Sequence, residues 1–168
     1  MSTAFDPNRF RQALGCFPTG VTIITARGGD GGDVGVTANS FNSVSLDPPM
    51  VLWSIGKAST KIAAFLTATH FAVHVLALDQ EPLARRFATR GIDRFAGLSP
   101  ARGLGGVALL DGCAARFECR LAFQYQGGDH VILVGEVLTF DSSEREPLVF
   151  SKGCFASAVP RSGSFASQ

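Results

Sequence analysis

A long alternating segment in the C-terminal half constrains the fold of this chain most strongly. Its apolar positions are Ala115, Phe117, Cys119, Leu121, Phe123 and Tyr125, and the positions between them are Arg116, Glu118, Arg120, Ala122 and Gln124. Successive side chains of a β-strand point to opposite faces, so the pattern predicts one strand with an apolar face and a mostly polar face. The turn residues GGDH (127–130) then lead into the apolar run VILVGEVLTF. Together the two segments predict a long β-hairpin.

Several further segments have the β-branched and apolar composition of strands. They are VTIITAR, the stretch after Gly32, MVLWSI, HFAVHVLAL and a final pair, PLVF and CFASAV. The glycines and aspartates of GGDGGD (28–33) predict a hairpin loop, and LDPP (46–49) predicts a turn into a strand.

Three short segments predict helices. Asp6 and Pro7 suit an N-cap and a first helical position, followed by apolar residues at helical spacing. STKIAAFL (59–66) starts with a residue suited to capping, and QEPLARRFA (80–88) has apolar residues one turn apart. Helices inserted singly among strands joined by tight turns favour a mainly β fold, a closed or nearly closed antiparallel barrel, over a doubly wound sheet.

Length and composition narrow the class of protein. A chain of 168 residues suits a single domain, with a core at about 10–157 and a tail at 158–168 that we expect to be flexible. Only 17% of the residues are charged, below the roughly 25% of an average domain, so we expect a partner subunit or ligand to cover part of the surface.

Charge and cysteine spacing exclude several functions. A net charge of +1 without a basic run disfavours nucleic-acid and membrane-surface partners. The first residues include Asp and Arg, unlike a signal peptide or membrane span, so we expect a cytoplasmic protein. The four cysteines lack a CxxC spacing and the three histidines are not grouped with them, so we expect free buried thiols and no zinc site or redox pair.

The common catalytic motifs are missing. GLGGVA (103–108) is the nearest match to a dinucleotide-binding glycine motif, but it neither follows a credible strand nor opens a helix. We find no phosphate-binding P-loop motif, no zinc-protease motif and no hydrolase nucleophile elbow.

Three local features remain as candidate sites. In KASTK (57–61), Ser59 and Thr60 with the flanking lysines suit either a phosphate site at a helix N-terminus or an ordinary N-cap. The small residues Thr37 to Ser40 suit either a wall for a flat ligand or a strand-end bulge. His130, at the hairpin turn, suits either a solvated side chain or one that reaches over a cleft.

Taken together, five blocks of the sequence resemble the short-chain flavin reductases, the NAD(P)H:flavin oxidoreductase components of two-component flavin-dependent monooxygenases. They are FPTGVTIITA (17–26), GVTANSFNSVSLDPPMVLWSI (35–55), HFAVHVLALDQEPLARRFA (70–88), GGDHVILVGEV (127–137) and PLVFSKGCF (147–155), and they occur in the family's order and spacing. The chain departs from the family at His74, commonly Asn, and at Phe155, often Tyr.

This resemblance implies a flavin-binding antiparallel split β-barrel that forms a homodimer, with the flavin near the subunit interface. It implies FMN or FAD as cofactor and NADH or NADPH as co-substrate. The residues implied for the flavin ring and ribityl chain are Thr37, Ala38, Asn39, Ser40, Ser54, Ile55 and Gly56. Those implied for the phosphate or adenylate are Ser59, Thr60, Lys61, Arg86 and Phe87, and those implied for the nicotinamide are His130 and Phe155.

The function implied is reduction of a flavin by a nicotinamide and transfer of the reduced flavin to a partner oxygenase. Since flavin supplies the difficult chemistry, this function is consistent with the missing acid–base and nucleophile motifs. Two alternatives stay open: a flavoprotein that holds FMN for storage or sensing without turnover, and an oxidase of the pyridoxal phosphate pathway with similar architecture, which the five blocks fit less well.

Overall fold

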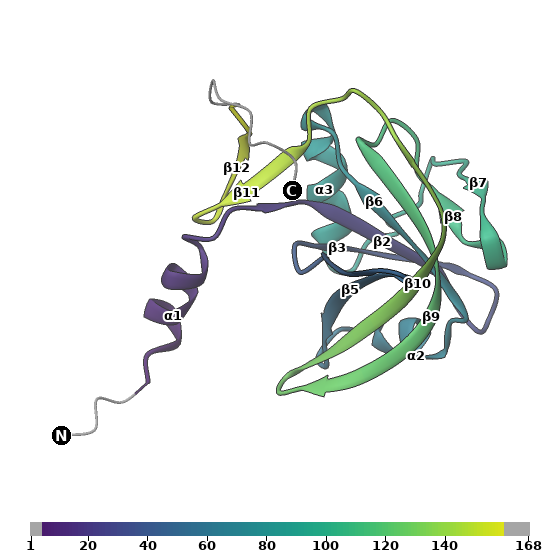
Figure 1. Cartoon of the computed structure of the whole chain (residues 1–168), viewed down its shortest axis with the longest axis horizontal. Coiled ribbons are helices and arrows are strands. Elements are labelled where there is room, and N and C mark those ends of the chain that lie inside the picture. The colour runs from purple at the N-terminus through teal and green to yellow at the C-terminus, as the bar shows by residue number, and fades with distance from the viewer. Residues whose placement is uncertain (1–4, 160–168) are drawn as a thin grey trace.

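The computed structural model describes residues 5–159, and a strongly curved sheet of seven strands forms its centre (Figure 1). The strand order is β3-β2-β6-β9-β10-β5-β4, and every neighbouring pair is antiparallel. The strands are β2 (Thr22–Arg27), β3 (Asp33–Ala38), β4 (Asn42–Leu46), β5 (Pro49–Gly56), β6 (His70–Val75), β9 (Ala115–Gly127) and β10 (His130–Ser142). The predicted mainly β, antiparallel class is confirmed.

Smaller elements surround this sheet. Two further sheets are β1 (Thr19–Gly20) with β11 (Leu148–Ser151) and β12 (Cys154–Ser157), and β7 (Ala101–Arg102) with β8 (Ala108–Leu109). The helices are α1 (Pro7–Leu14), α2 (Ile62–Thr67), α3 (Glu81–Ala88) and the short 3₁₀ turns η1 (Leu78–Gln80) and η2 (Leu104–Gly106). The glycine motif at 103–108 follows the two-residue strand β7, which the sequence did not predict, and it leads through the turn η2 into β8 without opening an α-helix.

Two main clusters of buried side chains form the core, one that includes Phe65 of α2 and one that includes Phe87 of α3. Trp53 packs edge-on against Phe65 of α2, with ring centroids 4.9 Å apart, and also contacts Phe71 of β6. Gly135 of β10 lies close to the ring of Phe71, and a Cβ there would come within 2.4 Å of it. This close approach explains why the apolar run of β10 contains a glycine.

The predicted single apolar face of the 115–125 strand is wrong beyond Leu121. Ala122 has no partner on β10, because Leu121 pairs with Gly135 while Phe123 already pairs with Val134. This β-bulge places the residues after it on the opposite faces from those that simple alternation predicts. Gln124 now lies beside the core residue Leu133, and the stacked rings of Phe123 and Tyr125 are about half exposed.

Of the two N-caps predicted from the sequence, the structure confirms the one at Asp6 and contradicts the one at Ser59. Asp6 caps α1 by accepting from the backbone N–H of Asn8, at 2.8 Å, and of Arg9, as predicted. The helix predicted from Ser59 begins only at Ile62, with Lys61 at the N-cap position and no side-chain cap. Ser59 instead accepts a hydrogen bond from the Lys61 backbone N–H within a tight turn, so the N-cap interpretation of KASTK is wrong.

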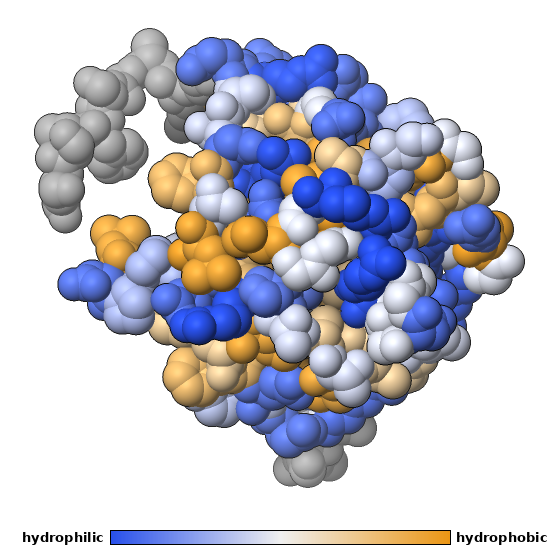
Figure 2. Space-filling view, turned by 90° about the vertical axis from the view of Figure 1, so that its right-hand side faces the viewer, coloured by the Kyte–Doolittle hydropathy of each residue, from blue (hydrophilic) through white to orange (hydrophobic). Residues whose placement is uncertain are grey.

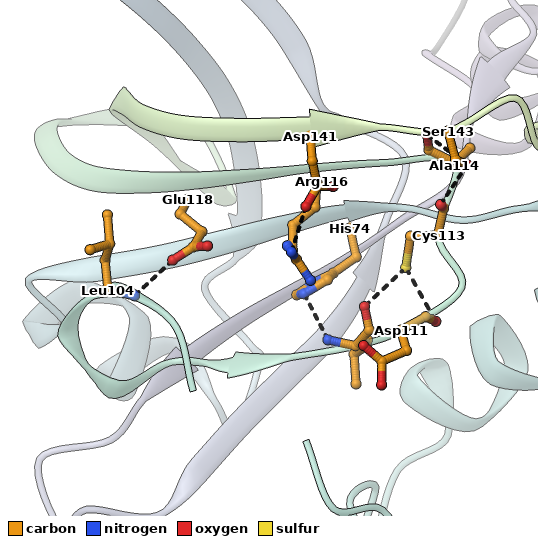
Figure 3. Close-up of polar contacts among 10 residues, drawn as sticks. His74, Leu104, Asp111, Cys113, Ala114, Arg116, Glu118, Asp141 and Ser143 are labelled. Atoms are coloured by element: carbon orange, nitrogen blue, oxygen red, sulfur yellow. Dashed lines mark hydrogen bonds and ion pairs between the residues drawn. The ribbon is translucent and has the colours of Figure 1, made fainter. Parts of the chain in front are cut away.

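His74 is a fully buried polar link between the sheet and the segment after β8 (Figure 3). Its Nδ1 lies 3.0 Å from the carbonyl oxygen of Ile23, and its Nε2 accepts from the backbone N–H of Leu110 at 3.1 Å. Both contacts suit the neutral ring with its proton on Nδ1. Burial lowers the pKa of His74 to about 4, with a smaller contribution from the charge of Arg116.

Within residues 5–159, no helix has the length and apolar character that crossing a bilayer requires.

Candidate functional site

A cavity of about 750 Å³ opens where the ends of β3 and β5 meet the 57–60 turn, the C-terminal end of α3 and the β9–β10 turn. Ligand pockets in proteins commonly fall in this size range. Eleven of the residues singled out from the sequence line it: Thr37, Ala38, Asn39, Ser40, Ser54, Ile55, Gly56, Ser59, Thr60, Phe87 and His130. The structure thus brings together four segments that are far apart in the sequence.

Strand pairing explains how these segments meet. β5 pairs with β10, so Gly56 at the end of β5 lies opposite His130 at the start of β10. On the other side, the Ser40 hydroxyl donates to the carbonyl of Ser54 at 3.1 Å and accepts from its N–H at 2.9 Å. This reciprocal pair joins the segment after β3 to β5, so the cavity wall is held by hydrogen bonds that the strand ladders do not supply.

Some side-chain hydroxyls that line the cavity already hydrogen-bond to backbone groups of the protein. The Thr37 hydroxyl donates to the carbonyl of Ala84 at 2.7 Å, and that of Ser40 is occupied by Ser54 as described. Among the described residues, the side chains of Asn39 and Thr60 have no recorded hydrogen bond, and both residues are exposed. Thr37 and Ser40 therefore shape the wall, whereas Asn39 and Thr60 have side chains available for a ligand.

The cavity has a positive balance of charge. Lys57, Arg90 and Arg94 line it with one carboxylate, that of Asp129. Arg94 is held in place by the carbonyls of Gly35, at 2.6 Å, and Thr89, at 3.0 Å, and burial lowers the pKa of its guanidinium. Arg90 is exposed and has no recorded ion pair in the described part of the chain. This balance favours an anionic group such as a phosphate.

Sequence reasoning missed Arg90 and Arg94. They belong to the irregular segment TRGIDRF that follows α3, and no motif or periodicity marks them. The contact that places Arg94 at the cavity joins it to Gly35, 59 positions earlier in the chain. Such a long-range contact has no local sequence signal.

Three residues expected at the site lie outside this cavity. The guanidinium of Arg86 donates to the carbonyl of Ala96, which holds it on the loop that follows α3. Phe155 packs against Phe150, with the Arg85 guanidinium 4.8 Å from its ring centroid. Lys61 lines a separate small cavity of about 60 Å³. These three side chains do not line the cavity of Thr37 to Ser40, and their roles toward the flavin and the nicotinamide stay predictions.

The geometry suits a flat, partly polar ligand that ends in an anion. Small residues, Ala38 and Gly56 among them, line the walls, and the three cations line the same cavity as the Ser59 and Thr60 turn. In the part of the chain that the structure describes, residues 5–159, no group of three or more His, Cys, Asp or Glu is placed to hold a metal ion.

Comparison with known proteins yields a family and close relatives. The model of the flavin reductase like domain matches residues 14–158. The chain is 51% identical over 146 residues to an FMN reductase (NADH) of Agrobacterium fabrum, covering 87% of this chain and 83% of that protein. It is 40% identical to the reductase subunit of a flavin-dependent monooxygenase of Rhodococcus jostii, covering 94% of this chain and 80% of that protein.

A solved structure agrees with these relatives. The NADH:FAD oxidoreductase of Streptomyces globisporus, solved with NAD and FAD fragments, superimposes with a TM-score of 0.87 at 39% identity, covering 96% of this chain and all of that chain. Some relatives are longer, and the chain spans 65%, 48% and 47% of the length of three of them.

Proposed function

Because the chain belongs to the flavin reductase like family, we propose that it reduces FMN or FAD with NADH and delivers the reduced flavin to a flavin-dependent monooxygenase. The observation that carries this proposal is the cavity of about 750 Å³, where the segments 37–40, 54–60 and His130 meet beside three cations. The size and lining of the cavity fit a flavin. Two relatives of similar length to this chain are named as an FMN reductase and a monooxygenase reductase subunit. We propose that the matched region is one flavin reductase unit, folded as a split barrel.

The residues of the cavity have distinct roles in this proposal. Bound flavin supplies the hydride-accepting ring. Ala38 and Gly56 leave room for two stacked rings, and the backbone of 37–40 and 54–56 orients the first of them. Thr60 and Arg90 bind the phosphate, because both have side chains free for it. His130 faces the nicotinamide.

We propose that the functional form is a homodimer in the cytoplasm. Phe10 and Leu14 of α1 and the following Phe17 are exposed, and no residue of α1 is buried. Leu14 and Phe17 line a second cavity of about 430 Å³ that shares Asn39 with the first. A partner that covers this apolar surface would therefore lie next to the flavin site. Four free cysteines are in keeping with a reducing compartment, although Cys16 and Cys154 are exposed, so the prediction that the thiols are buried is wrong for these two.

A turnover assay tests the function. Purified protein with a large molar excess of NADH and free FMN or FAD should oxidise many equivalents of NADH per protein chain under anaerobic conditions. A storage or sensing flavoprotein would oxidise at most one equivalent, and that result would overturn the proposal. Repeating the assay with NADPH identifies the preferred donor.

A further inference from the structure

The second cavity, of about 430 Å³, lies where the C-terminal end of α1 meets the turn between β11 and β12 (Figure 1). In that turn the backbone N–H of Lys152 donates to the carbonyl of Gly15 at 2.9 Å, which joins the turn to the end of the helix. Both residues line the cavity, which we call the α1 cavity. Its volume is within the range of pockets that bind small organic molecules.

The α1 cavity has two cations in its lining and no anion. Arg11 and Lys152 line it, both are exposed, and no Asp or Glu is among the lining residues. Within residues 5–159 neither cation has a recorded ion pair, and the one recorded hydrogen bond of their side chains joins Arg11 to Asn8 at 3.1 Å. An anionic group in this cavity would therefore meet two positive charges that no carboxylate of the described chain neutralises.

The backbone holds one of these cations at the cavity. Among the described residues, Lys152 is the one non-glycine residue with a left-handed φ, at 49°. Such a conformation costs free energy and persists only where surrounding contacts hold it, as the hydrogen bond to Gly15 does here. The start of the Lys152 side chain is therefore fixed next to the end of α1.

The other lining residues are mostly apolar, with an unpaired hydroxyl among them. Phe17 and Phe150 line the cavity, and Phe17 is 73% exposed. Thr19 lines it too, and its hydroxyl oxygen is shielded from solvent without a recorded hydrogen-bond partner in the described chain. Buried hydroxyls in proteins are nearly always paired. A polar ligand atom beside Thr19 would give this hydroxyl a partner once the threonine side chain rotates toward it.

The α1 cavity is separate from the larger cavity of about 750 Å³. Asn39 is the one lining residue that the two have in common. A ligand of the α1 cavity would therefore lie next to a flavin in the larger one without occupying the flavin's place.

We propose that the α1 cavity binds an aromatic carboxylate, whose ring packs against Phe17 and Phe150 and whose carboxylate pairs with Arg11 and Lys152. A neutral aromatic molecule would leave both cations unpaired, and an inorganic anion would leave the ring of Phe17 in water, so a ligand that carries both groups fits best. This inference goes beyond the proposed function, which concerns the larger cavity, and it does not depend on it.

Calorimetric titration of the FMN-saturated protein tests the site with two probes of the same shape, 1-naphthylacetate and the neutral 1-naphthylacetamide. We expect the acid to bind with a Kd of about 1 mM or lower, a modest affinity for a ligand of this size. The amide should bind roughly tenfold more weakly, because it has no charge to pair with the cations. Lys152→Met should weaken binding of the acid roughly tenfold and that of the amide less than about twofold.

Two further variants make the result specific. Arg9→Gln removes an exposed cation of α1 that does not line the cavity, so it should leave the affinity for the acid within about twofold of wild type. Phe17→Ala removes an aromatic ring and no charge, so it should weaken binding of the acid and the amide by equal factors. Circular dichroism and light scattering check that each variant keeps the fold and the oligomeric state of the wild type.

Three outcomes would overturn the inference. One is that the acid does not bind to the wild type, as expected if a second copy of the chain fills the cavity. Another is that the acid binds only without FMN or is displaced by NAD+, which would place it in the reaction site. The third is an equal loss in Lys152→Met and Arg9→Gln, which would indicate a general effect of net charge. The NADH turnover assay remains the separate test of the proposed function.

Discussion

At the scale of single residues, the cavity separates side chains that build the site from those free to meet a ligand. Thr37 and Ser40 hydrogen-bond to the protein, and Arg94 is fixed by two carbonyls. Arg90 and Thr60 line the same cavity with no recorded side-chain partner in residues 5–159. Substitutions in the first group are therefore expected to alter the fold locally, and those in the second to alter binding.

Arg90→Gln tests this distinction. Loss of a charge-assisted hydrogen bond to a phosphate costs on the order of 1.5 kcal/mol at an exposed position, so we expect FMN to bind roughly tenfold more weakly in a fluorescence titration. Raising the salt concentration should weaken FMN binding less in the variant than in the wild type. Arg86→Gln is the matched control, because Arg86 lies four positions away and donates to the carbonyl of Ala96 outside the cavity. The affinity of this variant for FMN should stay within twofold of that of the wild type. Equal losses in both variants would contradict the assignment.

His74 should make stability depend on pH. Its pKa is about 4 in the folded protein and 6.5 for an unperturbed histidine, so the folded protein binds the proton more weakly than the unfolded chain. Its contribution is complete above pH 6.5 and is lost as the pH falls from 6.5 towards 4. Between pH 7 and pH 5 we expect the wild type to lose on the order of 2 kcal/mol of unfolding free energy that a His74→Asn variant does not lose. Urea unfolding at both pH values measures this, and parallel losses would refute it.

At the scale of elements, the β9–β10 hairpin shows how one extra residue changes an entire face. Up to Leu121 the apolar residues follow the predicted alternation toward the core, and the bulge at Ala122 then places Phe123 and Tyr125 on the outer face. Gln124 takes the inner position and donates to the carbonyl of Leu66 in α2. The hairpin thus continues past the core with an apolar outer face and carries His130 to the cavity.

Gly135, next to this bulge, should tolerate no side chain. A Cβ there would lie 2.4 Å from Cζ of Phe71 and 2.9 Å from Cβ of Cys119, both in the core. Overpacking of this kind typically costs 1–3 kcal/mol, so we expect Gly135→Ala to lower the urea-unfolding free energy by about that amount. Gly20→Ala, a strand glycine with nothing within 4 Å of an added Cβ, should change it by less than about 0.5 kcal/mol. A comparable effect in the two variants would show that the close approach is unimportant.

At the scale of the whole molecule, α1 extends away from the sheet (Figure 1). A helix of eight residues is marginal by itself in water, yet this one buries none of its residues. On the face that carries β7 and β8, hydrophobic residues form small groups separated by hydrophilic ones (Figure 2). The apolar side chains of α1 and of the outer hairpin face are therefore the surfaces expected to be covered in the proposed homodimer.

Light scattering tests the dimer. We expect a mass of twice 17.7 kDa, and a shift toward the mass of one chain in the double variant Phe10→Ser and Leu14→Ser, which removes the exposed apolar face of α1. Gln12→Ser, on the same helix, should leave the mass unchanged. A wild-type mass of one chain at micromolar concentration would contradict the homodimer.

The sequence alone predicted every strand of the central sheet except β4, and much of the cavity lining, but not the two-residue strands β1, β7 and β8. Periodicity, β-branched composition and turn residues are local, so they predicted the β2–β3 hairpin loop, the β11–β12 pair and the strand character of β5 correctly. The resemblance of the five blocks supplied the family. It also grouped Thr37 to Ser40 with Ser54 to Gly56, which the structure places around one cavity.

Only the tertiary structure decided which side chains face the cavity. The bulge at Ala122 depends on how β9 pairs with β10, and the places of Arg90 and Arg94 depend on how the segment after α3 packs against β3. Arg86 and Phe155 had the residue types expected for the site, but contacts with Ala96, Phe150 and Arg85 keep them elsewhere. Local sequence patterns predict whether a segment forms a strand or a helix. The places of these side chains instead depend on contacts between residues far apart in the chain, which no local pattern contains.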